Sequence, residues 1–444
     1  MAKNIVIFSD GTGNIGAKNR GTNVYKLFEA IDVHQDNPKQ IAFYDDGVGT
    51  SRLKPLKLLG GAIGIGLRRN VLELYQSIAR VYEEGDQIYL FGFSRGGFTV
   101  RMLAGLIAKC GIIPGKELGA KLEGEARKSW RVYRAAYPSK CRQCLEIVKY
   151  SLVGKKPAAP SVGRQNSSSD ARIYFIGVWD TVDAYGIPFK RLSTWICDWV
   201  YRYSFPDHDL SPAVSHARQA LAVDDERRTF HPLLWNDDPR IRQVWFPGMH
   251  SDVGGGYPKH GLSLLSMHWM IQEVRRIAEV FEPENMTALT EAERVKKRGL
   301  ILVEADREYF ENRSNSDDSM HNSRSGPAVF YQYAPRDIAT ICAKHKLTEV
   351  LMHDSVLRRI WQQTQGYTPK NLPLEFKVET TGGSRESAPK VALDGRNNKS
   401  VYESAFGAMR TRWWLQRIQY GVYAALVGRV LSHEYGRGVS FLDG

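Results

Sequence analysis

The stretch that most restricts the fold of this chain is residues 87–107, where an apolar run, a glycine-flanked serine and a second apolar run follow one another. The run that ends at Phe93 reads as a buried strand, and the apolar residues beyond the glycines recur at helical spacing. Gly92, Ser94 and Gly96 fit G-x-S-x-G, a sharp strand-to-helix turn that exposes a serine hydroxyl. Side chains two residues to either side of that serine would clash, so glycine is required there. The pattern predicts Ser94 as a nucleophile at the end of a sheet strand.

Short apolar strands and helices alternate on both sides of this turn. Strands are expected within residues 3–8, 40–50, 87–94, 171–186 and 243–258, and helices within residues 59–86 and 95–110. Such alternation is typical of a parallel sheet with helices on both faces. Together with the serine turn, it predicts an α/β protein with the α/β-hydrolase fold, in which helices flank a mostly parallel central sheet.

We expect the chain to divide into two parts. Residues 1–270 are predicted to form the catalytic core, with insertions near 116–170 and 187–215 that include a helical cap. Residues 271–444 are predicted to be mainly helical and packed on the core. The polar, glycine-containing stretch near 378–399 reads as a flexible loop within that part.

A catalytic serine needs a histidine base, and the base needs a carboxylate to orient it. In the α/β-hydrolase fold the acid follows the serine along the chain and the histidine comes last. Asp180 ends the apolar run IYFIGVWD and is the expected acid, with Asp183 in the following turn as the alternative. His250 lies between QVWFPGM and SDVGGGY, where small residues let an imidazole approach the serine. We therefore predict a triad of Ser94, His250 and Asp180.

Two turns are the expected sources of amides for an oxyanion hole. The helix after Ser94 presents free N–H groups at its start, and the amide of Arg95 is the first of them. The second donor in this fold comes from the turn after an early strand, where SDGTGN supplies the amides of Gly11 and Thr12. Asp10 beside them reads as a residue that caps its own turn.

The net charge of +13 over 444 residues favours an anionic partner without identifying it. No nucleic-acid-binding motif accompanies the charge, so nucleic acid is not an expected partner. The five cysteines are scattered, and Cys141 and Cys144 form a CxxC with no second pair at the spacing of a zinc ribbon. We therefore expect neither a metal nor another cofactor.

The apolar run from Ile5 to Phe8 is too short for the apolar region of a signal peptide. A membrane-spanning helix would need about 18 consecutive apolar residues without charge, and the chain has no such stretch. With few cysteines, this favours a cytoplasmic location. Peripheral membrane attachment and export by a non-classical route are the alternatives.

Several segments of the chain follow one another in an order that is familiar from one family. They are SDGTGN, FYDDGVGT, GFSRGGFTVRMLAGLI, GVWDTVDAYG, HARQALAVDDERRTFHP and VWFPGMHSDVGGGY, followed by HNSRSGPAVFYQYAPR and MHDSVLRR. From about residue 3 to about residue 362 the chain resembles the α/β-hydrolase family of type VI secretion lipase effectors, the Tle-like phospholipases. The resemblance implies phospholipase A-type hydrolysis of glycerophospholipids at a membrane surface. It implies Ser94 as nucleophile, Asp180 as acid and His250 as base, and it leaves open a delivery or immunity protein as partner.

Two aromatic stretches bear on access to lipid. Residues 189–205 lie between the acid and the base and form either a lid or part of the core. Residues 411–431 carry Trp413 and Trp414 among arginines and form either an amphipathic membrane-binding helix or a helix packed on the core. A soluble carboxylesterase acting on small esters is the alternative enzyme. A non-catalytic interaction protein that keeps this fold is the alternative of another class.

Overall fold

The structure is a computed structural model. It describes residues 2–11, 21–36, 38–47, 61–135, 171–183, 208–280, 299–324, 331–373, 375–380 and 385–387. Several of the sequence predictions fall outside these residues. They are the oxyanion amide of Thr12, the Cys141–Cys144 pair, the aromatic span 189–205, the segment 411–431, and most of the predicted insertions near 116–170 and 187–215 and of the predicted loop near 378–399.

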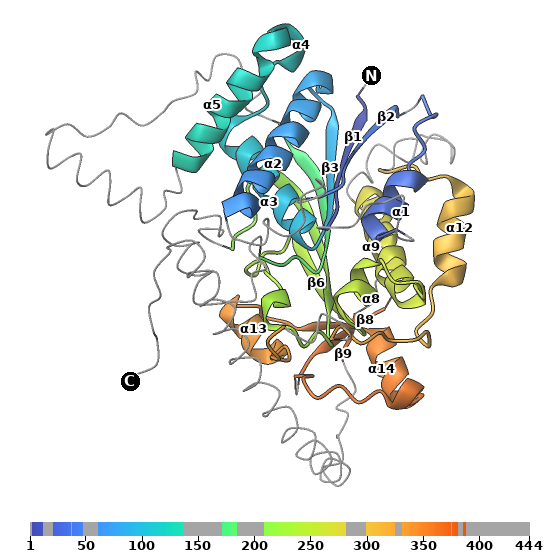
Figure 1. The fold of residues 1–444 in the computed structure, drawn as a ribbon. Helices are drawn as coiled ribbons and strands as arrows, with labels where there is room; N and C mark the ends of the chain where they lie inside the picture. The colour runs from blue at the N-terminus through green and yellow to red at the C-terminus, as the bar shows by residue number, and fades with distance from the viewer. Residues whose placement is uncertain are drawn as a thin grey trace, which may run out of the picture.

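A nine-stranded sheet forms the centre of the protein (Figure 1). Its strands are β1 (Asn4–Ser9), β2 (Gln40–Asp45), β3 (Gln87–Phe93), β4 (Ile173–Trp179), β5 (Val214–Ala222), β6 (Ile241–Phe246), β7 (Leu351–His353), β8 (Lys377–Glu379) and β9 (Arg385–Ser387). They lie in the order β2-β1-β3-β4-β5-β6-β7-β8-β9. The first eight strands pair in parallel, and β9 pairs antiparallel with β8. The predicted α/β class with a mostly parallel sheet is therefore confirmed.

Helices cover both faces of this sheet (Figure 1). They are α1 (Asn23–Ala30), α2 (Gly61–Val81), α3 (Arg95–Cys110), α4 (Gly115–Leu118), α5 (Leu122–Ala135), α8 (His250–Gly254), α9 (Gly261–Val280), α12 (Glu304–Arg313), α13 (Ile338–Lys344) and α14 (Asp354–Trp361). Helices α2, α3 and α5 pack on one face, and α1, α9 and α12 on the other. No helix in the described part of the chain is both long enough and apolar enough to cross a membrane.

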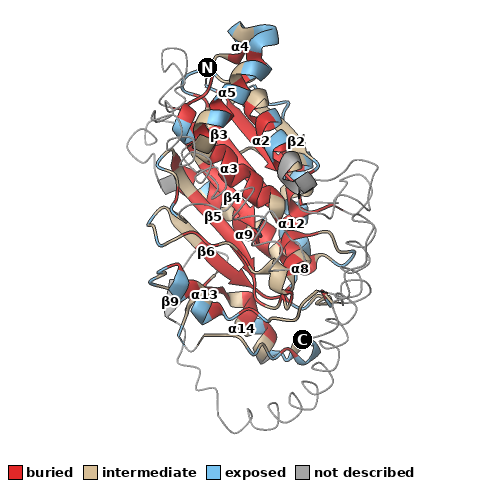
Figure 2. Cartoon of the chain, turned by 60° about the vertical axis from the view of Figure 1, so that its left-hand side comes forward, coloured by how far each residue is buried: buried red, intermediate tan, exposed pale blue. Residues whose placement is uncertain are grey.

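Burial on both faces explains why the central strands are continuous apolar runs. In β1, Ile5 and Ile7 join the core beneath α2 and α3, whereas Val6 and Phe8 join the core beneath α1 and α9. All four side chains are fully buried. Figure 2 shows the same burial along the neighbouring strands. A strand with a solvent-facing side would instead alternate apolar and polar residues.

The sheet continues beyond the predicted catalytic core. The sequence predicts a mainly helical part after residue 270, but three of its segments form the strands β7, β8 and β9. Two of these strands lie at or within the predicted loop near 378–399. Each strand is only three residues long, too short for an alternating pattern to be read. Met352 of β7 packs with Trp245 of β6 and Ile338 of α13 in one core cluster, so this part shares its core with the sheet.

The glycines around Ser94 are required by close backbone contacts. A Cβ atom at Gly92 would lie 2.6 Å from the carbonyl oxygen of Gly96, and one at Gly96 would lie 1.9 Å from the carbonyl oxygen of Ser9. Ser94 itself has φ 57° and ψ −121°, a conformation that L-residues rarely adopt. The strand, the strained serine and the helix thus form the predicted turn.

Gly96→Ala should destabilise the protein by about 3 kcal/mol or more, since the added methyl overlaps backbone that cannot move aside. Gly124→Ala is the matched control, because Gly124 is an exposed helical glycine and a methyl group added there would meet nothing within 4 Å. It should be neutral or stabilising by up to about 1 kcal/mol. Urea unfolding of both variants measures the difference. Equal stabilities would contradict the close contact of α3 with β1.

Candidate active site

The carboxyl ends of β3, β4 and β6 bring the three predicted triad residues to one edge of the sheet. Ser94 follows β3 and Asp180 follows β4, and the last residues of these strands, Phe93 and Trp179, are paired in register. His250 begins α8, just beyond the end of β6. This edge is where open parallel sheets place their ligand sites.

Backbone bonds fix Ser94 beside the end of β4. Its N–H donates to the carbonyl of Trp179 at 3.0 Å, and its own carbonyl accepts from the N–H of Val182 at 3.5 Å. Ser94 occupies the N-cap position of α3, yet its side chain makes no capping bond. The hydroxyl is therefore not used to hold the helix, and it lies at the positive end of the α3 dipole.

Asp180 and His250 form a buried pair. The Asp180 Oδ2 and the His250 Nδ1 lie 2.6 Å apart. Asp180 is fully buried and His250 is 4% exposed. The alternative acid, Asp183, is exposed. A carboxylate at Nδ1 leaves Nε2 as the nitrogen that faces away from the acid, which is the arrangement a general base requires.

Two aromatic rings hold the imidazole of His250. Its centroid lies 4.6 Å from that of Phe93 and 4.9 Å from that of Phe230. Phe93 directly precedes Ser94, so the histidine ring packs against the residue next to the serine. A Cβ atom at Gly254 would lie 2.0 Å from the Phe93 ring, which shows how tightly α8 approaches the turn.

The short helix that carries His250 is anchored at its first turn. The Asp252 carboxylate accepts the N–H of Met249 at 3.0 Å and the N–H of His321 at 3.1 Å, and it lies 2.6 Å from the His321 Nδ1. The N–H of His250 itself donates to Asp225 at 3.2 Å. These bonds satisfy amides at the start of α8 that have no partner within the helix.

The charges around the pair set its protonation. Burial raises the pKa of Asp180, but the cation of Arg336 and the bond to His250 outweigh burial and hold that pKa well below its usual range. Burial lowers the pKa of His250, and Asp180 offsets this only in part. His250 is therefore neutral, and able to accept a proton, at pH values where an ordinary histidine is partly protonated.

Two of the three predicted oxyanion amides, those of Gly11 and Arg95, lie in the described part of the chain, and they differ in whether they are already bonded. The amide of Arg95 is the first of α3. The amide of Gly11 donates to the side chain of Asp10 at 2.6 Å, so it is not free for a ligand. The sequence did not indicate that Asp10 is fully buried, or that its carboxylate also accepts the hydroxyls of Thr22 and Tyr44. The amide of Thr12 lies outside the described residues.

Sequence reasoning missed Arg336, Asp225 and Arg227. Arg336 donates to both oxygens of Asp180 at 2.7 Å each. Asp225 accepts the backbone N–H, the Nε and the Nη2 of Arg227. Arg336 lies in the segment HNSRSGPAVFYQYAPR and Asp225 in HARQALAVDDERRTFHP. Both segments belong to the family resemblance, but neither indicated that these residues contact the triad.

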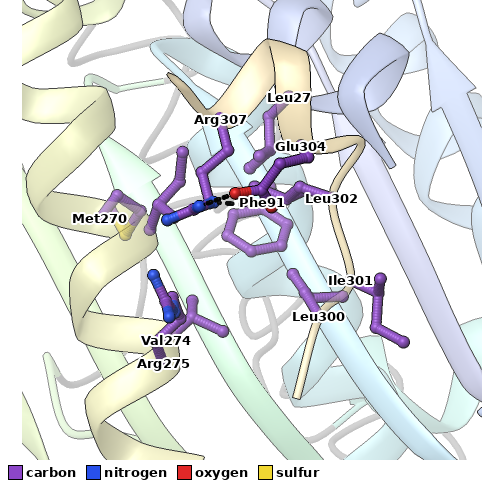
Figure 3. A pocket seen from close by; sticks show the side chains of 11 residues that line it. Leu27, Phe91, Met270, Val274, Arg275, Leu300, Ile301, Leu302, Glu304 and Arg307 are labelled. Atoms are coloured by element: carbon purple, nitrogen blue, oxygen red, sulfur yellow. Dashed lines mark hydrogen bonds and ion pairs between the residues drawn. The ribbon is translucent and has the colours of Figure 1, made fainter. Parts of the chain in front are cut away.

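A separate cavity of about 270 Å³ opens where α9, α12 and the loop before α12 meet the sheet (Figure 3). Its walls are mostly apolar, as at Phe91, Met270 and Leu302. Glu304 and Arg307 at this cavity pair with each other. None of the triad residues lines it, so it is not the candidate active site.

Among the described residues, no group of three or more His, Cys, Asp or Glu side chains is placed to hold a metal ion.

Comparison with protein families shows the family to which the chain belongs. The family model of the type VI secretion system (T6SS) phospholipase effector Tle1-like catalytic domain matches residues 3–273. The chain belongs to this family. The family resemblance seen in the sequence is thus confirmed.

Individual relatives of this Tle1-like chain are distant. An uncharacterized protein of Saccharomyces cerevisiae, YEL023C, is 26% identical over an alignment of 257 residues, and the match covers 55% of this chain and 34% of that protein. A crystal structure of an uncharacterized protein from Pseudomonas aeruginosa is 14% identical, with a TM-score of 0.39, over 85% of this chain and 56% of the other. A structure of the Tle1 effector bound to the VgrG spike is 18% identical, with a TM-score of 0.32, over 58% and 52%.

Replacing Asp180 in this Tle1-like chain by asparagine should lower the pKa of His250 further below 6.5. The reason is that Asp180 raises that pKa through its charge and its hydrogen bond. Asp183→Asn is the control, since it makes the same chemical change at an exposed aspartate three positions along. NMR titration of the histidine ring protons in wild type and both variants gives the result. A larger shift in Asp183→Asn than in Asp180→Asn would mean that the histidine's partner is wrongly assigned.

Proposed function

We propose that this protein is a serine hydrolase that cleaves carboxylic ester bonds of glycerophospholipids, with a phospholipase A-type activity. The observation that carries the proposal is the buried Asp180–His250 pair, 2.6 Å apart, packed against the strained turn that presents Ser94. Membership of the phospholipase effector family supports lipid as the substrate class. The chain spans about a third of the yeast relative and about half of each solved structure, so the activity is proposed for this chain on its own residues.

The chemistry would proceed through an acyl-enzyme. His250 Nε2 takes the proton of the Ser94 hydroxyl while the Ser94 oxygen bonds to the ester carbonyl carbon. The amide of Arg95 donates to the resulting oxyanion. When the carbon–oxygen bond to glycerol breaks, His250 gives its proton to the leaving alcohol, and the acyl group stays on Ser94. Asp180 holds the imidazole at Nδ1 and stabilises its charged form.

Water completes the cycle by the same steps. His250 removes a proton from a water molecule, whose oxygen attacks the acyl carbon. The bond to the Ser94 oxygen then breaks, that oxygen regains the proton from His250, and a fatty acid leaves. The protein returns to its starting state, and the overall reaction consumes one ester and one water.

The Arg95 side chain supports a substrate with a phosphate. Within the described part of the chain, its guanidinium makes no hydrogen bond and no ion pair, and burial without a counter-charge lowers its pKa to about 10. Among the described residues, Tyr331 is the group whose charge opposes this shift. A phosphodiester bound next to the nucleophile would supply the missing negative charge. The net charge of +13 would also draw the protein to anionic bilayers.

Ser94→Ala and His250→Ala should each reduce release of fatty acid by about 10³-fold or more, because losing either residue removes the same step. Anionic phospholipid vesicles, with products identified by mass spectrometry, provide the assay. A fluorophosphonate probe should label wild type and not Ser94→Ala. Ser129→Ala, a change at a buried serine of α5, serves as the control and should keep both labelling and turnover. Turnover by a purified, folded Ser94→Ala protein near the wild-type rate would refute the nucleophile.

Arg95→Met should lower kcat/KM for phosphatidylglycerol roughly tenfold or more, while kcat/KM for diacylglycerol with the same chains falls by less. The backbone amide of residue 95 is unchanged by this substitution, so the oxyanion contact is kept. Arg131→Met removes one charge from an exposed site on α5 and controls for weaker recruitment to anionic surfaces. Both substrates are presented in the same detergent micelles. Equal losses on the two substrates would remove phosphate recognition by Arg95 and favour a general esterase.

A further inference from the structure

We propose that Arg336 is a positioning residue of the triad, which holds the Asp180 carboxylate in one orientation and keeps it ionised beside His250. The inference rests on the proposed function, because it concerns how the same triad works. It assigns a role in the reaction to a residue that lies outside the segment matched by the family model, residues 3–273.

The contact between the two side chains is bidentate and fully buried. Nη1 of Arg336 donates to Oδ1 of Asp180 and Nη2 donates to Oδ2, both at 2.7 Å, and both side chains are fully buried. Oδ1 also accepts the N–H of Ala222 at 3.0 Å, and Oδ2 lies 2.6 Å from His250. Each carboxylate oxygen thus has two partners. With four contacts in place the carboxylate cannot rotate without breaking charged hydrogen bonds, so Oδ2 stays directed at the histidine.

The backbone that carries Arg336 is itself held against the site. Residues 332–334 run beside residues 226–231: the N–H of Arg228 donates to Gln332 at 2.9 Å, and the N–H of Ala334 donates to Glu226 at 2.8 Å. The guanidinium of Arg336 also donates to the carbonyls of Ala222 and Phe230. Phe230 in turn packs on the His250 ring. Arg336 is therefore positioned by the paired segments 226–231 and 332–334, which also contact His250 through Phe230.

The negative and positive charges around His250 balance one another. Among the described residues, the charged groups that face His250 are Asp180 and Asp225, with Arg227 and Arg336 as their partners. Removing the Arg336 cation would leave the two carboxylates with a single arginine. The unbalanced negative charge would then hold a proton on His250 more tightly. The acid limb of kcat/KM would consequently move to higher pH, which is opposite to the shift expected when Asp180 loses its charge.

Arg336→Lys and Arg336→Gln test the proposal on a soluble short-chain ester, with kcat, KM and the pH profile measured for each. Arg336→Lys keeps the positive charge but loses the two parallel N–H donors of the guanidinium. We therefore expect kcat to fall roughly ten- to a hundredfold with little change in KM. Arg336→Gln should also shift the acid limb upward. Arg359→Lys is the matched control. Arg359 is equally buried and donates to backbone carbonyls of Ser316 and Asp318, so its replacement should leave the pH profile unchanged.

A double-mutant cycle separates positioning from a merely structural role. If Arg336 acts through Asp180, Asp180→Asn combined with Arg336→Gln should be no slower than Asp180→Asn alone. A further loss equal to that of Arg336→Gln in the wild-type background would overturn the proposal. The proposal would also be overturned if a folded Arg336→Lys protein kept the wild-type kcat and pH profile while Ser94→Ala was inactive. Full activity of Ser94→Ala and Asp180→Asn would instead refute the proposed triad itself. Circular dichroism melts confirm that each variant is folded.

Discussion

The candidate site depends on how closely α3 lies against the ends of the two strands beside it. A Cβ atom at Gly96 would fall 1.9 Å from the carbonyl oxygen of Ser9, and one at Gly97 would fall 2.5 Å from the hydroxyl of Thr181. The turn between β3 and α3 therefore cannot relax outward or inward, and Ser94 is kept at φ 57°. A strained residue persists only where its surroundings over-determine it. Here the strain is maintained by packing on β1 and on the turn after β4, both distant in sequence.

The same region keeps four charged side chains away from water: Asp180, Asp225, Arg227 and Arg336. Each carboxylate has an arginine partner and further hydrogen bonds, without which burial of these charges would be strongly unfavourable. Because the two negative and two positive charges balance, His250 lies in surroundings of little net charge. Burial then dominates its titration, which explains why its pKa is lowered although a carboxylate lies 2.6 Å away.

The fold and the residues at strand ends could be predicted from the sequence because their signals are local. Ser94, Asp180 and His250 each follow an apolar run that is buried on both faces, and glycine spacing identified the turn. The structure places Asp180 against His250, as the spacing predicts, while the assignment of their catalytic roles stays a prediction. The strands after residue 350 left no such signal, because three residues show no period.

The availability of the Gly11 amide and the role of Arg336 could not be predicted, for a different reason. The amide of Gly11 is taken by the side chain of Asp10, a competition that depends on how deeply that carboxylate is buried. Arg336 meets Asp180 across 156 residues of chain. Nothing in the local pattern of either residue marks such a pairing, since only the path of the backbone through the fold brings them together.

The position of Arg336 also bears on where the functional unit ends. The family model stops at residue 273, yet the carboxylate of Asp180 has its arginine partner from a later segment, and β6 has its outer neighbour in β7. A chain cut at that point would keep the triad residues while leaving a fully buried carboxylate without its cation. Loss of one member of a buried pair costs about 3–5 kcal/mol, a large fraction of the stability of an ordinary domain. The part after residue 273 is therefore a component of the site, because the ionised acid of the proposed triad requires it.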